Sequence, residues 1–337
     1  MWTWTISDSV EPMNYRKLGS TDVAVSEISL GCWTMGGLNW VDGQANGWAE
    51  VNEGEITAAV KRAVGAGVNH FDNADVYGNG RAERMLARIL KNLGLKSENF
   101  IIATKVGHFR GTADHAYDPL HIRHQCEQSL KNLQRDYIDI YYLHHGDFGP
   151  NGEWLAGAAA TLDALVQEGK VRLKGQSAYG DADFQRAVPV VKPAVLQSWG
   201  NALRPNFIKP DSVVGKLLAE HRMSFVAFSP MQQGILLDKF DPDNPPAFAE
   251  GDNRRNHPRF QPDFLRPLKP KLVRLKARFG ATTGALAAVA LRYVLNHPNV
   301  ACVIPGFRKE SQVTGNLTAV NCRLGDDDIA FIDQTFA

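Results

Sequence analysis

The sequence predicts a single-domain α/β protein with the (β/α)8 fold of the TIM barrel. Short apolar or β-rich runs alternate with longer segments of helical spacing, a pattern that produces parallel strands joined by right-handed crossovers. Eight such units occur, which favours a closed barrel over an open sheet. The predicted strands are Ile28–Gly31, Val68–Phe71, Phe100–Thr104, Ile138–Leu143, Val171–Ser177, Ala194–Ser198, Phe225–Phe228 and Val300–Ile304. Helical patterns occupy Glu55–Val64, Arg81–Asn92, Leu120–Leu133, Thr161–Glu168 and Thr283–Leu295.

Composition is that of an ordinary globular protein. The chain has 337 residues, of which 44% are hydrophobic and 22% are charged, so it can build a core without disulfides or a structural metal. A formal net charge of +1 provides no global attraction to nucleic acid or acidic membranes, and we expect neither as a partner. A local basic pocket for a phosphate group stays open as a possibility.

The cysteines and the N-terminus favour a cytoplasmic protein. The four cysteines show neither a CxxC pair nor zinc-ligand spacing, as is usual in a reducing compartment; they are Cys32, Cys126, Cys302 and Cys322. Residues 1–8 lack the charged and apolar regions of a signal peptide, and the apolar stretch Gly284–Leu295 is too short to span a bilayer. We expect residues 1–13 to be a loosely ordered extension and residues 14–337 to form the barrel.

Two long irregular segments follow predicted strands. Residues 32–51 contain Trp33, Trp40 and Trp48 among glycines, and residues 232–263 are rich in Pro, Asp and Arg. In a barrel, the loops after the strands form the active site, so both segments are expected there. They could also be disordered insertions, but loops of this length in compact domains are more often functional.

Four ionisable residues occupy or follow the ends of three consecutive strand units. Asp72, Lys105 and His144 each come directly after a predicted strand, and Tyr77 lies in the loop after Asp72. The carboxyl ends of barrel strands lie on one rim, so we expect these side chains to converge there.

This set suits protonation of an alkoxide that forms as hydride reaches a carbonyl. A phenol has a pKa of about 10, and a neighbouring ammonium group is expected to lower it. Asp72 would pair with Lys105 and offset the cost of its burial, while His144 can hydrogen-bond to a substrate oxygen. Each residue alone also has a structural interpretation: an ion pair for Asp72 and Lys105, a core histidine for His144 and packing for Tyr77.

At these residues the sequence strongly resembles the aldo-keto reductase family. The stretch Gly67–Gly78 resembles the signature that holds the catalytic Asp and Tyr, Ala103–Val106 the catalytic-lysine motif, and Asp136–His144 the histidine motif. The resemblance covers residues 14 to about 321 and is strongest to the bacterial branch and to potassium-channel β subunits. It implies that Asp72, Tyr77, Lys105 and His144 are catalytic, and that the chain reduces an aldehyde or ketone with NADPH.

The resemblance also implies an NADP(H) molecule lying across the barrel rim without a Rossmann domain, which fits the lack of a GxGxxG motif after the first strand. Phe228 would stack on the nicotinamide, Ser177 and Gln197 would bind its amide, and the start of a helix near Arg308 and Lys309 suits a 2′-phosphate. Those two cations could instead be a solvated helix start. The residues assigned to the cofactor are Trp33, Asp72, Ser177, Gln197, Phe228, Ser229, Pro230, Met231, Gly234, Lys239, Arg255, Gly306, Arg308, Gln312 and Asn316.

The sequence departs from the family pattern at two positions. Ala178 stands where the family usually carries Asn after the serine, so one amide contact is lost or replaced, with Gln197 or Asn201 as the candidates. His145 replaces a common aromatic residue and would make the pocket more polar. We expect the substrate pocket to be formed by Trp33, Trp40, Trp48 and His145, although the tryptophans could also be loop packing.

Two other functions are compatible with the residues. The chain could be a nucleotide-sensing partner subunit with vestigial catalysis, because such subunits can keep the four residues. Lys105 could also be the Schiff-base lysine of a barrel aldolase, but its Asp72 and Tyr77 neighbours and the cofactor motifs argue against that. The leading prediction is a reductase that acts on a small-molecule carbonyl substrate and contains no metal.

Overall fold

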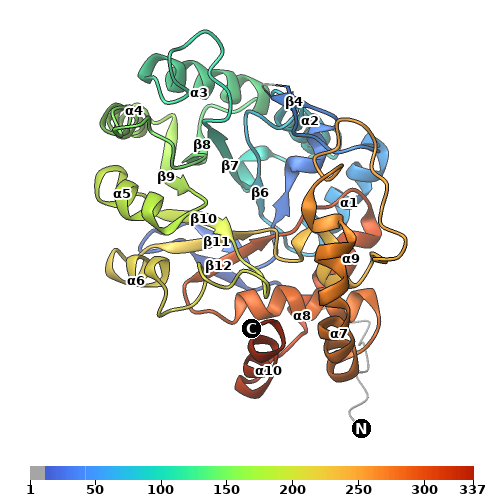
Figure 1. Cartoon of the computed structure of the whole chain (residues 1–337). Helices are drawn as coiled ribbons and strands as arrows, with labels where there is room; N and C mark the ends of the chain where they lie inside the picture. The colour runs from blue at the N-terminus through green and yellow to red at the C-terminus, as the bar shows by residue number, and fades with distance from the viewer. Residues whose placement is uncertain (1–11, 42) are drawn as a thin grey trace.

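The computed structural model describes residues 12–41 and 43–337 and forms one (β/α)8 barrel (Figure 1). The barrel sheet has eight parallel strands in the order β12-β11-β10-β9-β8-β7-β6-β3. Parallel bridges from Ile28 to Val303 and from Gly31 to Gly306 connect its two edges. The strands are β3 (Leu30–Gly31), β6 (His70–Asp72), β7 (Ile101–Val106), β8 (Ile138–Leu143), β9 (Val171–Ser177), β10 (Val195–Trp199), β11 (Ser224–Phe228) and β12 (Val300–Ile304).

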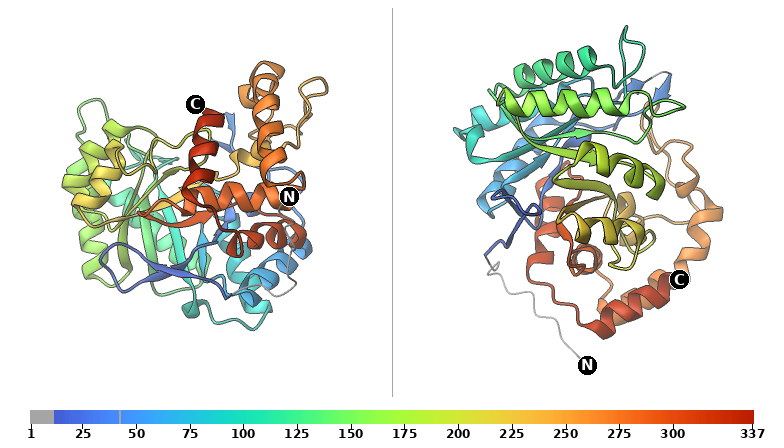
Figure 2. Two further views of the ribbon diagram at one scale, coloured as in Figure 1. Left: turned by 90° about the horizontal axis from the view of Figure 1, so that it is seen from below. Right: turned by 90° about the vertical axis from the view of Figure 1, so that its left-hand side faces the viewer.

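Helices surround the sheet, as the views in Figures 1 and 2 show. Two of them, α7 and α8, lie between β11 and β12, and α10 packs against α7. The helices are α1 (Glu53–Gly65), α2 (Arg81–Asn92), α3 (Pro119–Leu133), α4 (Leu155–Gln167), α5 (Asp181–Val191), α6 (Val213–Glu220), α7 (Pro262–Phe279), α8 (Thr283–Leu295), α9 (Glu310–Leu317) and α10 (Asp326–Phe336).

The predicted fold is confirmed, and all eight predicted strands are present with ends shifted by at most two residues. The prediction for α4 was too short, because the run from Leu155 to Ala160 is mostly alanine and lacks the polar–apolar contrast that marks a helix face. Of the expected N-terminal extension, residues 1–11 lie outside the described residues. Met13 is 8% exposed and belongs to the main hydrophobic core.

The barrel has two separate apolar regions. The larger one fills the space between strands and helices. The smaller one fills the barrel interior, where side chains from the strands meet Leu18, Val23 and Val25 of an N-terminal hairpin. That hairpin, β1 (Tyr15–Lys17) paired with β2 (Ala24–Ser26), closes the end of the barrel at which the strands begin.

Strand alternation determines which polar side chains enter the barrel interior. Successive side chains of a strand point to opposite faces, and Ala103, Tyr142, Val195 and Val226 belong to the interior group. The residues two positions further along these strands therefore point inward as well, at the carboxyl ends. These are Lys105, His144, Gln197 and Phe228.

His70 is a buried interior residue whose protonation should influence stability. Its side chain is fully buried and its Nδ1 lies 3.0 Å from Ser29 Oγ. Burial lowers the His70 pKa to about 4, although the charge of Asp72 opposes the shift. The unfolded chain binds this proton at a pKa of about 6.5, so the folded state loses stability as the pH falls from about 6.5 towards 4.

We therefore predict that His70→Asn, which keeps a polar partner for Ser29, reduces acid destabilisation. The loss of unfolding free energy between pH 7 and pH 5 should be about 2 kcal/mol smaller in the variant than in the unmodified chain. Urea unfolding at both pH values measures this difference. Equal losses in the two proteins would contradict the assignment.

Candidate active site

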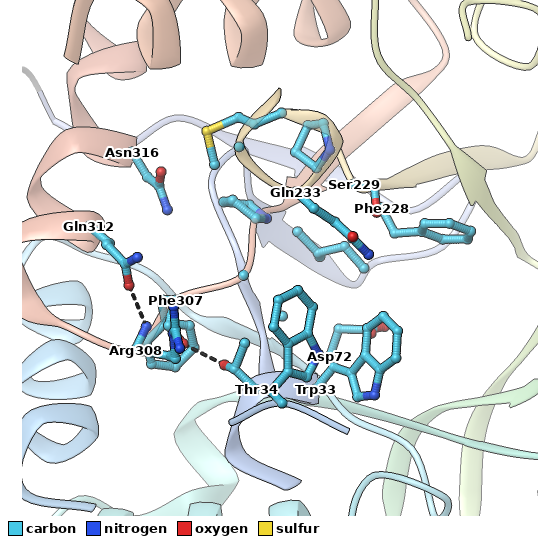
Figure 3. A pocket seen from close by; sticks show the side chains of 18 of the residues that line it. Trp33, Thr34, Asp72, Phe228, Ser229, Gln233, Phe307, Arg308, Gln312 and Asn316 are labelled. Atoms are coloured by element: carbon cyan, nitrogen blue, oxygen red, sulfur yellow. Dashed lines mark hydrogen bonds between the residues drawn. The ribbon is translucent and has the colours of Figure 1, made fainter. Parts of the chain in front are cut away.

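A cavity of about 740 Å³ opens at the carboxyl ends of the barrel strands. Trp33, Asp72 and Phe228 lie at one end of it, and Arg308, Gln312 and Asn316 at the other (Figure 3). Volumes of this size accommodate extended ligands. The cavity is elongated, and its two ends differ in chemistry.

A buried ion pair forms the floor of the first end. Lys105 Nζ lies 2.5 Å from Asp72 Oδ1, and the two side chains are 0% and 2% exposed. Lys105 also donates a 2.6 Å hydrogen bond to the Asn73 carbonyl. Gln197 Nε2 donates to the second Asp72 oxygen at 2.8 Å. The ammonium and the carboxylate therefore both have the additional partners that a buried ion pair needs.

Tyr77 lies directly over this ion pair. Lys105 Nζ is 5.2 Å from the centroid of the Tyr77 ring, and Trp33 stacks on Tyr77 at 5.9 Å with an interplanar angle of 24°. The backbone at Tyr77 packs closely against Gly36: a Cβ on Gly36 would lie 2.8 Å from the Tyr77 carbonyl carbon. Only glycine fits at that position.

The expected lowering of the Tyr77 pKa is not found. Burial raises the pKa of the phenol well above its usual value, and the negative charge of Asp72 adds to the effect. The charge of Lys105 is offset by its direct contact with Asp72, so it does not dominate at the phenol. Tyr77 is accordingly protonated across the physiological pH range.

His144 is part of a group of imidazoles on the neighbouring strand ends. Its ring lies 6.0 Å from the Tyr77 ring and 4.2 Å from the ring of His108. Burial lowers the His144 pKa well below its usual value, and His108 and Lys105 contribute to the shift. His144 Nδ1 is buried without a hydrogen-bond partner among the described residues. The neutral ring thus presents its Nε2 side to the cavity.

Most of the predicted site residues line this cavity. Asp72, Tyr77 and His144 do so together, with Lys105 enclosed directly beneath them. The other predicted residues that line it are Trp33, Trp48, Gln197, Phe228, Ser229, Pro230, Met231, Gly234, Lys239, Gly306, Arg308, Gln312 and Asn316.

Four predicted residues are placed elsewhere. Trp40 is 49% exposed and packs over Gly251 on the outside of the loops. His145 uses both ring nitrogens internally, with Nε2 2.6 Å from the Gly107 carbonyl and Nδ1 accepting from the Asp147 amide. Arg255 is exposed and faces Glu250. Ser177 is buried in β9 outside the cavity lining.

The two residues expected to substitute for the amide that Ala178 lacks differ in their surroundings. Gln197 reaches the cavity, whereas Asn201 donates hydrogen bonds to the Ser229 carbonyl at 3.0 Å and to Gln232 Oε1 at 3.1 Å. Asn201 thus holds the loop after β11 in place.

Several lining residues were missed by sequence reasoning. His108 and Tyr179 follow the ends of β7 and β9 by two residues, and Trp199 is the last residue of β10. Their closeness to the strand ends could have identified them, because Asp72, Lys105 and His144 had been selected by that criterion. Thr34 and Asn46 had no such signal, because contacts distant in sequence place their loop.

The second end of the cavity carries positive charge. Lys239 and Arg308 both line it, and burial together with the charge of Arg308 lowers the Lys239 pKa. Lys239 forms no ion pair with any residue in the described part of the chain. Arg308 pairs with the exposed Glu50 at 3.5 Å and donates a hydrogen bond to the Ala49 carbonyl at 3.1 Å. Asn316 Nδ2, in the same region, is buried and has no hydrogen-bond partner among the residues that the structure describes. An unpaired lysine, an arginine whose ion-pair partner is an exposed carboxylate, and a free amide donor indicate a site for an anionic group.

Two loops meet over the cavity. Gly47 bridges to Asp252, Asp252 Oδ2 accepts from the Ala49 amide at 3.1 Å, and the Asn253 amide donates to Gly47 at 2.9 Å. These contacts join the two long irregular segments that the sequence placed at the active-site face.

The comparisons with known proteins agree with this architecture. The model of the aldo/keto reductase family matches residues 27–336. A probable voltage-gated potassium channel subunit beta from Oryza sativa subsp. japonica is 28% identical, with 92% of each chain covered. The aldo-keto reductase yakc (NADP+) of Schizosaccharomyces pombe is 28% identical over 95% of this chain and 90% of its own. The structure of a glycerol dehydrogenase from Gluconobacter oxydans matches with a TM-score of 0.77 and 25% identity, covering 95% of this chain and 94% of its own.

The chain belongs to the aldo/keto reductase family, and it is an oxidoreductase. The resemblance seen in the sequence motifs is thereby confirmed. In the residues that the structure describes, no helix has the length and apolar character needed to cross a membrane.

The ion pair generates a stability prediction. Asp72→Asn leaves the Lys105 ammonium buried without its counter-charge and should lower the unfolding free energy by about 3–5 kcal/mol. Adding Lys105→Met removes that charge and should restore most of the loss. Urea unfolding of both variants measures this, and a double variant as unstable as the single one would disprove the electrostatic explanation.

Proposed function

We propose that this protein reduces aldehydes or ketones to alcohols with NADPH, and that Tyr77 donates the proton. One observation carries the proposal. The protonated phenol of Tyr77 lies over the buried Lys105–Asp72 pair, in a cavity that also contains His144.

The cavity fits a bound NADPH, whose dihydronicotinamide would supply the hydride. Phe228 would contact the nicotinamide ring and Gln197 its amide. The Ser229–Gly234 segment and Lys239 would hold the diphosphate, and Arg308 would hold the 2′-phosphate. The unpaired Lys239 and the Arg308 guanidinium, whose ion-pair partner Glu50 is exposed, support this fit, as does the NADP+ in the name of the fission-yeast relative.

The chain's own residues would manage the proton and the developing charge. An alkoxide is a far stronger base than a phenolate, so the Tyr77 hydroxyl can protonate it although burial raises the Tyr77 pKa. The Lys105 ammonium would stabilise the phenolate left behind. His144, kept neutral by burial, would donate a hydrogen bond from Nε2 to the carbonyl oxygen and orient it.

The alternatives are less well supported. A nucleotide-sensing subunit is supported by the similarity to the plant channel subunit. A Schiff-base role requires an accessible amine, whereas Lys105 is fully buried and bound to Asp72 and the Asn73 carbonyl.

The direct test of the proton donor is Tyr77→Phe. This variant removes the hydroxyl and keeps the ring that stacks on Trp33, so it should retain NADPH affinity within about two-fold while losing turnover by at least about 1,000-fold. Aldehyde-dependent NADPH oxidation and quenching of tryptophan fluorescence measure the two quantities. Undiminished turnover would remove Tyr77 from the role.

The two cations at the far end should bind different phosphate groups of the cofactor. Arg308→Met should weaken NADPH binding about 10- to 100-fold and NADH binding little, because a charge-assisted contact to the 2′-phosphate is lost. Lys239→Met should weaken both cofactors alike, because the diphosphate is common to them. Fluorescence titrations with both cofactors measure these effects.

Lys216→Met is the matched control for these titrations, because Lys216 is an exposed cation on α6, away from the cavity. It should leave both affinities unchanged. Equal losses for NADPH and NADH in Arg308→Met would contradict the assignment of the 2′-phosphate.

A further inference from the structure

His108 and Tyr179 form a polar pair in the cavity that the proposed reaction does not use. Both line the cavity, and Tyr179 Oη lies 3.3 Å from His108 Nε2. They follow β7 and β9, the strands on either side of β8. The His108 ring is also 4.2 Å from the ring of His144. A carbonyl held by His144 therefore has this pair as its immediate neighbour.

The pair has hydrogen-bonding capacity left over. Burial lowers the His108 pKa to about 4, so the imidazole is neutral near pH 7, with one nitrogen as donor and the other as acceptor. Nε2 faces Tyr179, whereas Nδ1 makes no hydrogen bond with any residue of the described segments and is not among their occluded side-chain atoms. The Tyr179 hydroxyl can donate and accept at the same time. The imidazole of His108 and the hydroxyl of Tyr179 can thus each form one more hydrogen bond.

An apolar substrate would leave these groups without partners. Polar atoms that lose water on ligand binding must regain a hydrogen bond or weaken the complex. A hydroxyl group matches the vacant positions because it donates and accepts. Neither an ammonium nor a carboxylate does so, since the first only donates and the second only accepts.

The remaining walls near this pair are aromatic. Trp33 meets Trp48 edge to face at 5.3 Å, and Trp199 lies 4.7 Å from Phe228. The Trp33 indole nitrogen is already bonded to the Asn46 carbonyl at 3.3 Å, so that ring offers mainly its apolar surface. Flat apolar walls around a small polar pair suit a carbon chain that carries hydroxyl groups.

We propose that His108 and Tyr179 form a specificity subsite that binds a hydroxyl group of the substrate, next to the carbonyl held by His144. This inference rests on the proposed reductase function. It assigns His108 and Tyr179 to specificity and leaves proton transfer to Tyr77.

A matched pair of substrates tests the subsite. Glyceraldehyde and propanal have the same carbon skeleton and differ in their hydroxyl groups. His108→Leu and Tyr179→Phe should each lower kcat/KM for glyceraldehyde about ten-fold and leave that for propanal within about two-fold. His108→Gln keeps a donor and an acceptor and should recover part of the glyceraldehyde activity.

The pattern of losses separates specificity from a structural role. Equal losses on both substrates would overturn the subsite, because His108 would then act by positioning His144. Unchanged kinetics on both substrates would also overturn it. NADPH affinity, measured in each variant, should stay unaltered.

A binding measurement keeps this test independent of turnover. In the protein saturated with NADP+, glycerol should bind more tightly than 1-propanol, and His108→Leu should abolish the difference, as followed by ligand-observed NMR. If the unmodified chain reduces neither aldehyde but shows this difference, the reductase proposal fails and the subsite stands. Equal binding of the two alcohols overturns the subsite.

Discussion

The buried contact between Lys105 and Asp72 is the interaction on which the rest of the site depends. An ammonium inside a barrel is tolerated only when a counter-charge and further acceptors surround it, and here Asp72 and the Asn73 carbonyl supply them. Gln197 then fixes the remaining Asp72 oxygen. Residues of β6, β7 and β10 are thereby tied together at one height in the barrel. The ring of Tyr77 packs against the Lys105 ammonium of this ion pair.

The same burial leaves the end of the cavity around Tyr77 and His144 with few unpaired charges. The Lys105 ammonium is paired with the Asp72 carboxylate, and burial keeps His144 and His108 neutral and Tyr77 protonated. Hydrogen bonds in such a desolvated region act strongly, because little solvent competes with them. Charge that develops on a reacting oxygen would therefore meet oriented dipoles and one fixed cation. This arrangement matches the electrostatic requirement of carbonyl reduction.

The sequence predicted the parts of the structure that depend on strand periodicity. Eight apolar runs defined the barrel, and positions at strand ends identified Asp72, Lys105 and His144 with few ambiguities. Resemblance added Gln197 and Phe228. Loop residues were less predictable, because long-range contacts place them: Trp40 packs outward over Gly251, and Arg254 rather than its neighbour Arg255 lines the cavity. The direction of the Tyr77 pKa shift was wrong, since the extent of burial cannot be read from spacing.

The polarity of the cavity follows from which cations are paired. Arg254 lines the wall, but Asp252 binds its guanidinium through contacts of 2.9 and 2.7 Å, and the rings of Trp48 and Phe248 flank it at 4.5 and 4.2 Å. The Arg254 guanidinium is thus held in an ion pair, as the Lys105 ammonium is. Lys239 and Arg308, at the opposite end, have no comparable buried counter-charge among the described residues. We therefore expect a ligand with one anionic end and one neutral ring to bind with the anionic end at Lys239 and Arg308 and with the ring at the end that holds Tyr77 and Phe228.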